Sequence, residues 1–556
     1  MRLLFLVFCL LLPTNALFPG AKREDGDYRH LYPIVSISFK VTDSDLSALP
    51  YLLGTVENWE YPKDRIHIDF FLEHQFETAK MAVSQWQYHV KSLFRSVDIH
   101  EKVQIWQESA LVMARRRSSN FVLISTIYNL LSKKALSQLT KLDLIAVTPF
   151  LVDAFEIATN ADTLANIGDN YLNQQNKSSI VVEKVLDPIL INLKKMDASY
   201  LTFDDENVLG LTKTDKTTAN DVLLHSAKVM GISIYMNNEI SYGDLLDIND
   251  STTKSQIDEV VSLHVANHIS EHGLNTLPVS VYIKPFYPIP KTFGFDKIYL
   301  INLGRRKERM RKMREILKVT GIKYERWNAV DGKELSEEEV SKSITFLPGY
   351  KDPIYKRPMK MGEIGCFMSH YGIWAEVISK VLSRVIVFED DIRFSKNAIK
   401  ILRESVVDLD KTNQEWDLIY FGRKKESKGG REFFVAGHSY LSTVTYSYWT
   451  LGYALSYSGA LKLVAGKPLE KMVALDEYIP IMFDSHPNKE WSSHFPNRDL
   501  KAFTTFPLIV TPQRYTNQEG YISDTEDSTI VESNTRKEYK NKDFKDKKAT
   551  ENKEEL

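Results

Sequence analysis

The stretch Val385-Ile386-Val387-Phe388-Glu389-Asp390-Asp391 joins a short apolar segment to three consecutive carboxylates. Four apolar residues in a row predict a buried central strand. In open α/β sheets, ligands bind beyond the carboxyl ends of the strands, which is where these carboxylates lie. A divalent cation such as Mg²⁺ or Mn²⁺ would relieve their mutual repulsion. The alternative is that Asp side chains cap a helix that begins near Ser395.

On both sides of this stretch the chain alternates apolar strands with amphipathic helices. In the C-terminal half, strands are predicted at 296–303, 324–330, 385–388 and 416–422, and helices at 306–317 and 361–378. In the N-terminal half, strands are predicted at 33–39, 66–72 and 121–124, and helices at 46–59, 76–90 and 105–115. Strands separated by helices indicate crossover connections and largely parallel sheets. The predicted fold class is therefore α/β, with two domains in tandem.

The domain boundaries are predicted from changes in composition. A Pro-rich linker at 284–294 separates a domain at 28–283 from a second domain at 295–532. The apolar run within residues 1–16 is too short to span a bilayer and predicts a secretory signal peptide. The charged tail at 533–556 ends in Lys-Glu-Glu-Leu, which is similar to a retrieval signal. We therefore expect a soluble protein of the endoplasmic reticulum lumen, without a transmembrane anchor.

Composition excludes several classes of protein. The 556 residues are 43% hydrophobic and 26% charged, which excludes global disorder. The net charge is -2, so no overall field attracts nucleic acid, and no nucleic-acid partner is expected. Two sequons, which begin at Asn176 and Asn249, are candidate glycosylation sites and fit a lumenal chain. No motif marks the oligomeric state, so a homo-oligomer stays open.

Two further motifs carry chemistry. A basic turn after the strand at 296–303 could bind phosphate oxygens, the alternative being a solvated helix face; its members are Arg305, Arg306 and Arg309. The adjacent carboxylates Asp476 and Glu477 precede an apolar helix, which they could cap. They could also supply a general base for a hydroxyl acceptor. His370 is predicted to be a core or surface histidine.

These motifs resemble glycosyltransferase family 25. The similarity rests on segments 299–309, 328–333, 362–370 and 388–391. The animal procollagen galactosyltransferase type is closer still, through segments 347–350, 448–453 and 523–526. The resemblance is dense over about residues 290–530 and weaker in the N-terminal half.

The resemblance implies two tandem Rossmann-like domains of the GT-A glycosyltransferase type. It implies that a hexose, galactose in this family, is transferred from UDP-galactose to hydroxylysine of collagen, with Mn²⁺ as cofactor. The transfer inverts the anomeric centre, so a base must deprotonate the acceptor hydroxyl. Collagen or collagen-like chains are the expected acceptor partners.

The resemblance also assigns site residues. Glu389 and Asp391 would hold the metal and UDP, with Asp390 as the reserve carboxylate. The predicted base is Asp476 or Glu477. The residues that would face the nucleotide phosphates are Arg305, Arg306 and Arg309.

The N-terminal domain departs from this family at an acidic pair. The relatives carry Asp-x-Asp after the strand that here reads 121–124, and Thr126 and Tyr128 stand at those positions. Neither is a good ligand for a divalent cation. One alternative function is therefore a non-catalytic pseudoenzyme that acts as a lumenal partner or scaffold. Another is a transferase with a different donor or acceptor.

Overall fold

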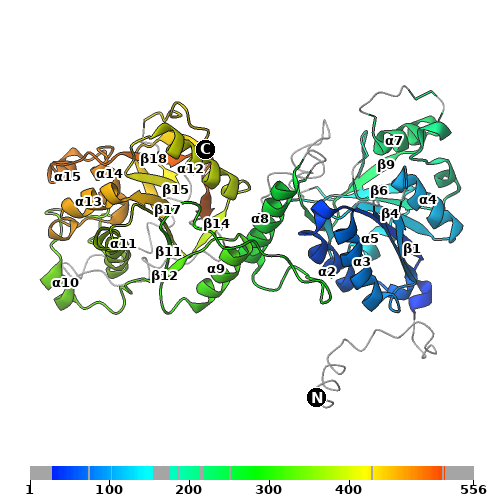
Figure 1. Ribbon diagram of the computed structural model, residues 1–556, viewed down its shortest axis with the longest axis horizontal. Coiled ribbons are helices and arrows are strands. Elements are labelled where there is room, and N and C mark those ends of the chain that lie inside the picture. The colour runs from blue at the N-terminus through cyan, green and yellow to red at the C-terminus, as the bar shows by residue number, and fades with distance from the viewer. Residues whose placement is uncertain are drawn as a thin grey trace, which may run out of the picture. The chain divides into compact units, whose positions relative to one another are not determined.

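The computed structural model describes residues 28–72, 76–101, 103–153, 176–185, 187–208, 210–211, 217–248, 252–426, 430–515 and 519. The chain divides into two compact units, each described here by itself (Figure 1). The first unit consists of the chain up to His268 and Leu274–Phe286. The second consists of Ile269–Gly273 and the chain from Tyr287 onward. The predicted signal peptide at 1–16, the charged tail at 533–556 and Asn249 lie outside the described residues.

The first unit is built on a mixed sheet with the strand order β3-β2-β1-β4-β8-β6-β9-β7. Its strands are β1 (Val35–Val41), β2 (Ile66–Leu72), β3 (Ser96–Glu101), β4 (Phe121–Thr126), β6 (Ala146–Pro149), β7 (Ser179–Val181), β8 (Ile189–Asn192) and β9 (Ile234–Asn237). Strands β3, β2, β1 and β4 are parallel, and β8 runs antiparallel to β4. The short strands β5 (Asn129–Leu131) and β10 (Gly243–Leu245) form a separate antiparallel pair.

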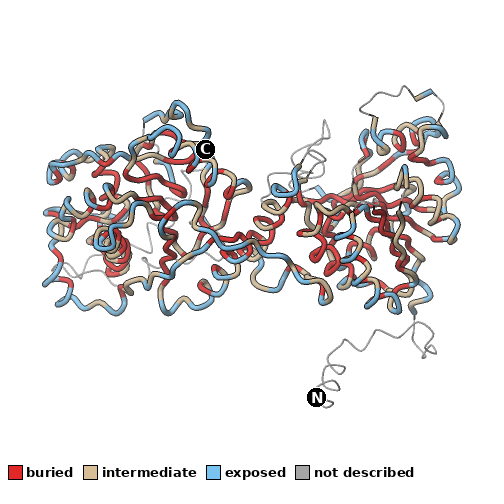
Figure 2. Tube along the Cα trace, viewed as in Figure 1, coloured by how far each residue is buried: buried red, intermediate tan, exposed pale blue. Residues whose placement is uncertain are grey.

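Helices connect these strands as the alternating pattern predicts. The helices of this part are α2 (Leu49–Asn58), α3 (Glu77–Val90), α4 (Trp106–Arg116), α5 (Ala135–Leu139), α7 (Ala219–Val229) and α8 (Lys254–His272). The last residues of α8 are assigned to the second unit. The sheet strands are largely apolar and buried, so they form the core that the helices cover (Figure 2).

The second unit is built on a mixed sheet with the order β12-β11-β13-β17-β15-β18-β16. Its strands are β11 (Lys297–Asn302), β12 (Glu325–Asn328), β13 (Arg384–Phe388), β15 (Leu418–Lys425), β16 (Leu441–Thr443), β17 (Ser447–Ser456) and β18 (Ala502–Thr505). Strands β12, β11 and β13 are parallel, and β17 runs antiparallel to β13 and β15. The predicted α/β class, with two sheet-based units in tandem, is confirmed.

The helices of the second unit are α9 (Lys307–Val319), α10 (Glu337–Ser343), α11 (Met361–Ser379), α12 (Ala398–Thr412), α13 (Tyr457–Ala465), α14 (Leu475–Met482) and α15 (Lys489–Ser493). Helices α10, α11, α13 and α14 share one apolar core with the sheet of this unit. Helix α11 buries Phe367 and Trp374 fully, and their rings pack against Tyr478 of α14. This contact fixes α14, and hence its first turn, relative to α11.

The segment after Asp391 does not form the helix that the capping alternative predicted near Ser395. Residues Ile392–Phe394 form strand β14, which pairs antiparallel with β19 (Val510–Pro512). Helix α12 begins only at Ala398, and Asn397 occupies its N-cap. The carboxylates at 389–391 therefore cap no helix, and that alternative is wrong.

Two glycines explain how the segment at 328–333 meets the start of α11. A Cβ on Gly332 would lie 2.3 Å from the carbonyl oxygen of Met361, and one on Gly365 would lie 2.5 Å from that of Val330. Real Cβ atoms do not approach backbone this closely, so only glycine permits the contact. The two backbones are thus held against each other beside the carboxyl end of β11.

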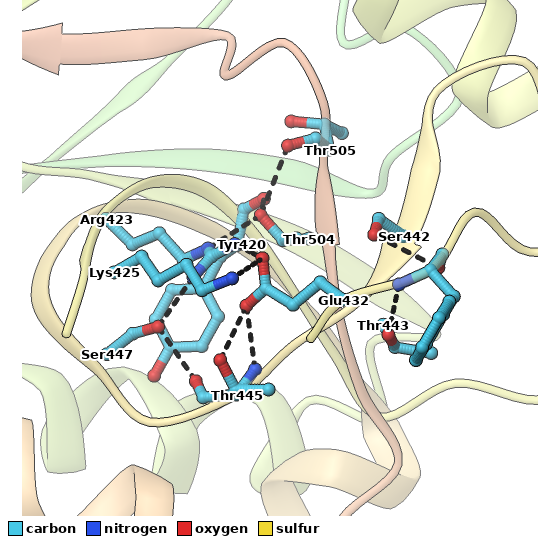
Figure 3. A network of polar contacts seen from close by, with 11 residues as sticks. Tyr420, Arg423, Lys425, Glu432, Ser442, Thr443, Thr445, Ser447, Thr504 and Thr505 are labelled. Carbon is cyan, nitrogen blue, oxygen red and sulfur yellow. Dashed lines mark hydrogen bonds and ion pairs between the residues drawn. The ribbon is translucent and has the colours of Figure 1, made fainter. Parts of the chain in front are cut away.

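A buried polar network anchors the chain that leads into β17 (Figure 3). Arg423 donates to Glu432 at 2.7 Å, to Ser447 at 2.7 Å and to Thr504 at 3.0 Å. Glu432 also accepts from the backbone and the hydroxyl of Thr445, at 2.9 and 2.8 Å. Breaking one member of such a network leaves a buried charge unpaired, so the network fixes the start of β17.

No helix in the described parts of the chain combines the length and the apolarity that a bilayer crossing needs.

Candidate functional site

Glu389 lies directly beyond the carboxyl end of β13, beside the middle of the sheet. Its backbone N–H donates to Leu451 of β17 at 3.0 Å, and its Oε1 accepts from the hydroxyl of Thr450 at 2.6 Å. His370 Nε2 lies 3.5 Å from the same oxygen. Burial alone would raise the pKa of Glu389, but the contacts with His370 and Thr450 outweigh it and lower the pKa. Glu389 is therefore held ionised.

His370 is oriented by a chain of buried donors. The indole N–H of Trp374 donates to the hydroxyl oxygen of Tyr453 at 3.0 Å, and that hydroxyl lies 2.9 Å from His370 Nδ1. An indole N–H can only donate, so Tyr453 is free to donate its own proton to Nδ1. This order leaves a proton on Nε2, which faces Glu389. The sequence predicted a core or surface histidine; the structure buries His370 and adds this contact with Glu389.

Asp390 points the other way and is satisfied by the protein itself. Its Oδ2 accepts from the side-chain amide of Asn302 at 2.5 Å, and its Oδ1 accepts from Arg309 at 3.1 Å. Arg309 also lies 3.5 Å from Asp391. The repulsion among the three carboxylates is thus relieved in part by Arg309, which the sequence assigned to nucleotide phosphates.

The rest of the basic turn lies nearby. Arg305 donates to Asp331 at 2.6 Å, and Arg306 occupies the N-cap of α9. Arg305 is exposed, and Arg306 and Arg309 are half-buried. Their roles toward phosphate stay predictions.

Donor chemistry and exposure distinguish the three carboxylates as metal ligands. Carboxylate oxygens are the ligands that Mn²⁺ and Mg²⁺ prefer. The side chains of Asp391 and Glu389 are 36% and 26% exposed, whereas that of Asp390 is 9% exposed. Asp391 and Glu389 therefore fit a hard cation that is approached from solvent, and Asp390 does not.

Asp476 lies in the first turn of α14, and its pKa is raised from the usual value. Burial raises its pKa to about 7, and the negative charges of Glu389, Glu477 and Glu363 add to this effect. The backbone N–H of Trp449 opposes the shift by bonding the carboxylate. A carboxyl group poised near neutrality is suited to proton transfer at physiological pH.

Glu477 is placed differently from Asp476, its neighbour in the chain. It is 2% exposed and contacts His486 at 2.6 Å, and the hydroxyls of Tyr446 and Tyr448 both donate to it at 2.8 Å. With both of its oxygens occupied by protein, Glu477 ties α14 to the start of β17. It is therefore placed to position Asp476 rather than to take a proton itself.

Trp449 joins these two carboxylates to Glu389. It precedes Thr450 in β17, and its φ of 68° is in the left-handed region, which bulky residues rarely adopt. Non-glycine residues in this conformation cluster at functional sites, where the surrounding structure holds them. The Asp476 contact and the Glu477 contacts with Tyr446 and Tyr448 supply that support.

One described thiol, Cys366 of α11, lies among the same carboxylates. Burial raises its pKa well above the usual value, and the charges of Glu389 and Asp476 add to the shift. A thiol held protonated in this way is a poor nucleophile. The raised pKa therefore argues against Cys366 as a nucleophile.

The corresponding position in the first unit is closed by neutral groups. Tyr128 donates its hydroxyl proton to Asp45, and Thr126 accepts from the side chain of Asn129 at 2.9 Å. Burial is the main cause that raises the pKa of Asp45, and the Tyr128 bond opposes it. No acidic pair stands at the end of β4.

The described residues do contain one compact group of metal-ligating side chains in the first unit. Asp244 of β10 and His264 and His268 of α8 place their ligand atoms within 4.8 Å of one another. No prediction from the sequence covers this group, although two His residues four positions apart on a helix would have indicated it. Asp244 gives no such signal, because it lies on a strand of three residues.

Of the two predicted glycosylation sites, Asn176 is described. It is exposed, and its backbone carbonyl accepts from Asn238 at 2.9 Å. The side chain is therefore accessible to modification.

Two family models match the chain, one for each unit. The model described as glycosyltransferase family 25 (LPS biosynthesis protein) matches residues 295–479. The model described as glycosyltransferase family 25, N-terminal domain, matches residues 32–265. The second match includes β4 and its altered end, so the first unit keeps the family's domain despite Thr126 and Tyr128.

Curated relatives are similar over most of their length. A glycosyltransferase 25 family member of Drosophila pseudoobscura pseudoobscura is 35% identical over 88% of this chain and 85% of its own. The procollagen galactosyltransferase 2 of Homo sapiens is 32% identical over 88% of this chain and 82% of its own. The procollagen galactosyltransferase 1 of Danio rerio is 31% identical over 95% and 92%. These matches favour a glycosyltransferase over the non-catalytic alternative.

Proposed function

Because the chain belongs to glycosyltransferase family 25, we propose that it transfers galactose from UDP-galactose to hydroxylysine of collagen. The observation that carries the proposal is the second unit's site, where ionised Glu389 and the poised Asp476 lie within electrostatic reach of each other. The names of the procollagen galactosyltransferase relatives support galactose as the sugar and procollagen as the acceptor, whereas UDP and hydroxylysine follow from the family resemblance.

In this proposal Asp476 is the general base. As the hydroxylysine oxygen forms its bond to the anomeric carbon, the bond from that carbon to the UDP oxygen breaks. The hydroxyl proton passes to Asp476, and UDP leaves with the bonding electrons. A pKa of about 7 lets Asp476 be deprotonated before the step and accept the proton during it.

Glu389 and Asp391 would hold the Mn²⁺ of this proposal. The ion would neutralise charge on the diphosphate leaving group. His370 and Thr450 fix the carboxylate of Glu389, and Arg309 sets the position of Asp391. Arg305 is the exposed arginine of the turn and the best placed for a phosphate.

The direct test is UDP release by the purified full chain. UDP-galactose or UDP-glucose, Mn²⁺ and a hydroxylysine-containing collagen peptide would be supplied. Release that depends on both UDP-galactose and the peptide supports the proposal, and release with UDP-glucose alone would change the donor. If folded protein releases no UDP with either sugar, the result would favour the pseudoenzyme alternative.

Variants assign the reaction to the second unit. Asp391→Ala is expected to abolish release while folding is unchanged. Asp499→Asn, an exposed carboxylate of the same unit, is the matched control and should keep full activity. Full activity of Asp391→Ala would remove Asp391 from the site.

We also propose that the reaction takes place in the lumen of the endoplasmic reticulum. Support comes from the signal-like residues 1–16, the terminal Lys-Glu-Glu-Leu and the exposed Asn176. In cells, the chain should carry a glycan at Asn176 that endoglycosidase H removes. An unglycosylated chain in the cytosolic fraction would contradict this location.

A further inference from the structure

We propose that Asp244, His264 and His268 form a transition-metal site of the zinc type in the first unit. The site is separate from the carboxylates of the second unit, and the proposal does not depend on the transferase activity. It gives the first unit a cation site although Asp-x-Asp is missing after β4.

The helix provides two nitrogen ligands on one face. His264 and His268 are four residues apart on α8, so their side chains project from the same side. The side chain of His264 is 2% exposed and that of His268 is 13% exposed. Neutral imidazole is the commonest metal ligand, and two imidazoles with one carboxylate are typical of zinc sites that keep an open position.

The carboxylate is held by backbone contacts on both sides. Strand β10 pairs with β5, where Asp244 lies opposite Leu130, and on its other side Asp244 forms a bridge with Val152. A Cβ on Gly243 would lie 2.2 Å from the carbonyl oxygen of Leu130. The glycine thus lets β10 lie directly against β5, which fixes Asp244 in front of the two imidazoles.

The distances fit coordination better than direct hydrogen bonds. Asp244 Oδ2 lies 3.6 Å from His264 Nε2 and 3.4 Å from His268 Nδ1. Hydrogen bonds of this type are about 2.7–3.2 Å long. In a tetrahedral site with bonds of about 2.0–2.2 Å, neighbouring ligand atoms lie about 3.3–3.6 Å apart. The two Asp244 distances match that spacing, and all three ligand atoms lie within 4.8 Å of one another.

His264 supplies an independent observation. Its Nε2 is buried and makes no hydrogen bond to any residue that the structure describes. An unsatisfied buried nitrogen that points at a carboxylate costs free energy, and a bound cation would remove that cost. Imidazole and carboxylate donors together suit Zn²⁺ better than Mg²⁺ or Ca²⁺, which prefer oxygen alone.

The site lies close to the altered end of β4. Strand β5 begins at Asn129, directly after Tyr128, and the carbonyl of Tyr128 accepts from Leu246 at 2.8 Å. The cluster is therefore built on the segments that adjoin the position where the family carries its acidic pair. A cation here would tie α8 to β10 and so stabilise this part of the first unit.

The test titrates the metal-free full chain with Co²⁺ and follows its visible absorption. Co²⁺ in a tetrahedral site absorbs far more strongly than Co²⁺ in an octahedral all-oxygen site, so the signal excludes binding at Glu389 and Asp391. We expect one strongly absorbing Co²⁺ per chain, displaced by Zn²⁺. The same signal in Asp391→Ala would show that it is independent of the proposed transferase site.

Single variants assign the ligands. His268→Gln and Asp244→Asn are each expected to weaken Co²⁺ binding about 100-fold. His272→Gln, on the same helix but outside the cluster, is the matched control and should bind as the unaltered chain does. Thermal unfolding in the presence of a chelator checks that each variant folds. A wild-type chain without the strong absorption, or an unchanged signal in both variants, would overturn the proposal and leave a plain His–Asp ion pair.

Discussion

Strands β4 and β13 occupy equivalent places in the two sheets, yet their ends carry opposite chemistry. Strand β4 lies between β1, to which it is parallel, and β8, to which it is antiparallel. Strand β13 likewise lies between the parallel β11 and the antiparallel β17. After β4 come Thr126 and Tyr128, which bond to neutral or buried partners. After β13 come Glu389 and Asp391, which are ionisable and partly exposed.

This difference shows that two similar strand arrangements can end in different chemistry. The core of β4 is as buried as that of β13, because packing depends on apolar residues that precede the strand's end. The residues after the strand contribute little to that core. Selection can therefore alter them without unfolding the domain, and function has to be argued from the site in each unit separately.

The largest expected effect comes from Asp476, the proposed base of the second unit. Asp476→Asn should lower kcat/KM for galactosyl transfer by about 100- to 10,000-fold, since general base catalysis contributes about that much. Its counterpart in the comparison is Asp45→Asn in the first unit, which should keep activity within about threefold. UDP release measures both. Equal losses would mean that the two units share the catalytic work.

A large effect on stability is expected from Arg309. In Arg309→Met, the buried carboxylate of Asp390 keeps the hydrogen bond from Asn302 but loses the ion pair with Arg309. Breaking such a pair costs about 3 kcal/mol of unfolding free energy. Arg305→Met, next in the same turn, removes a more exposed pair and should cost under about 1 kcal/mol. Urea unfolding compares the two, and similar losses would contradict the structural role given to Arg309.

An intermediate effect is expected from pH. Asp476 acts as a base only when deprotonated, and its pKa is raised to about 7. The value of kcat/KM should therefore rise about tenfold from pH 6 to pH 8, rather than level off near pH 5 as for an ordinary carboxylate. The residual activity of Asp476→Asn should lose this rise. A rise that persists in the variant would assign it to another group.

The smallest effect is expected when the missing acidic pair is restored. Thr126→Asp with Tyr128→Asp would place new carboxylates near Asp45, in place of the Tyr128 hydrogen bond. Their repulsion should lower the unfolding free energy by about 1 kcal/mol, and Mn²⁺ should restore it. Melting temperature with and without Mn²⁺ measures this. A melting temperature that does not respond to Mn²⁺ would show that the first unit has lost more than two ligands.

Much of the fold could be predicted because its strands and helices have strong periodic patterns. The strands at β2, β11 and β13 and the helices α9 and α11 lie within a few residues of the predicted ranges. Strand β17 was not predicted as a strand. Its antiparallel position between β13 and β15 depends on tertiary pairing, which local patterns do not contain.

The candidate site was harder to predict for a related reason. The carboxylates at the end of β13 could be found because sheet geometry determines where ligands bind. The contacts of Arg309 with Asp390, and of Thr450 with Glu389, join residues 81 and 61 positions apart, and no spacing rule indicates them. The separation of Asp476 from Glu477 depends on burial, which the sequence of two adjacent acids cannot reveal.

Cys366 has a consequence for how the protein responds to an oxidising environment. It is the one cysteine among the described residues, and its raised pKa keeps the sulfur protonated and slow to exchange with disulfides. The described fold therefore contains no covalent cross-link and rests on packing and polar contacts alone. A change in redox potential should therefore leave the described parts of both units intact.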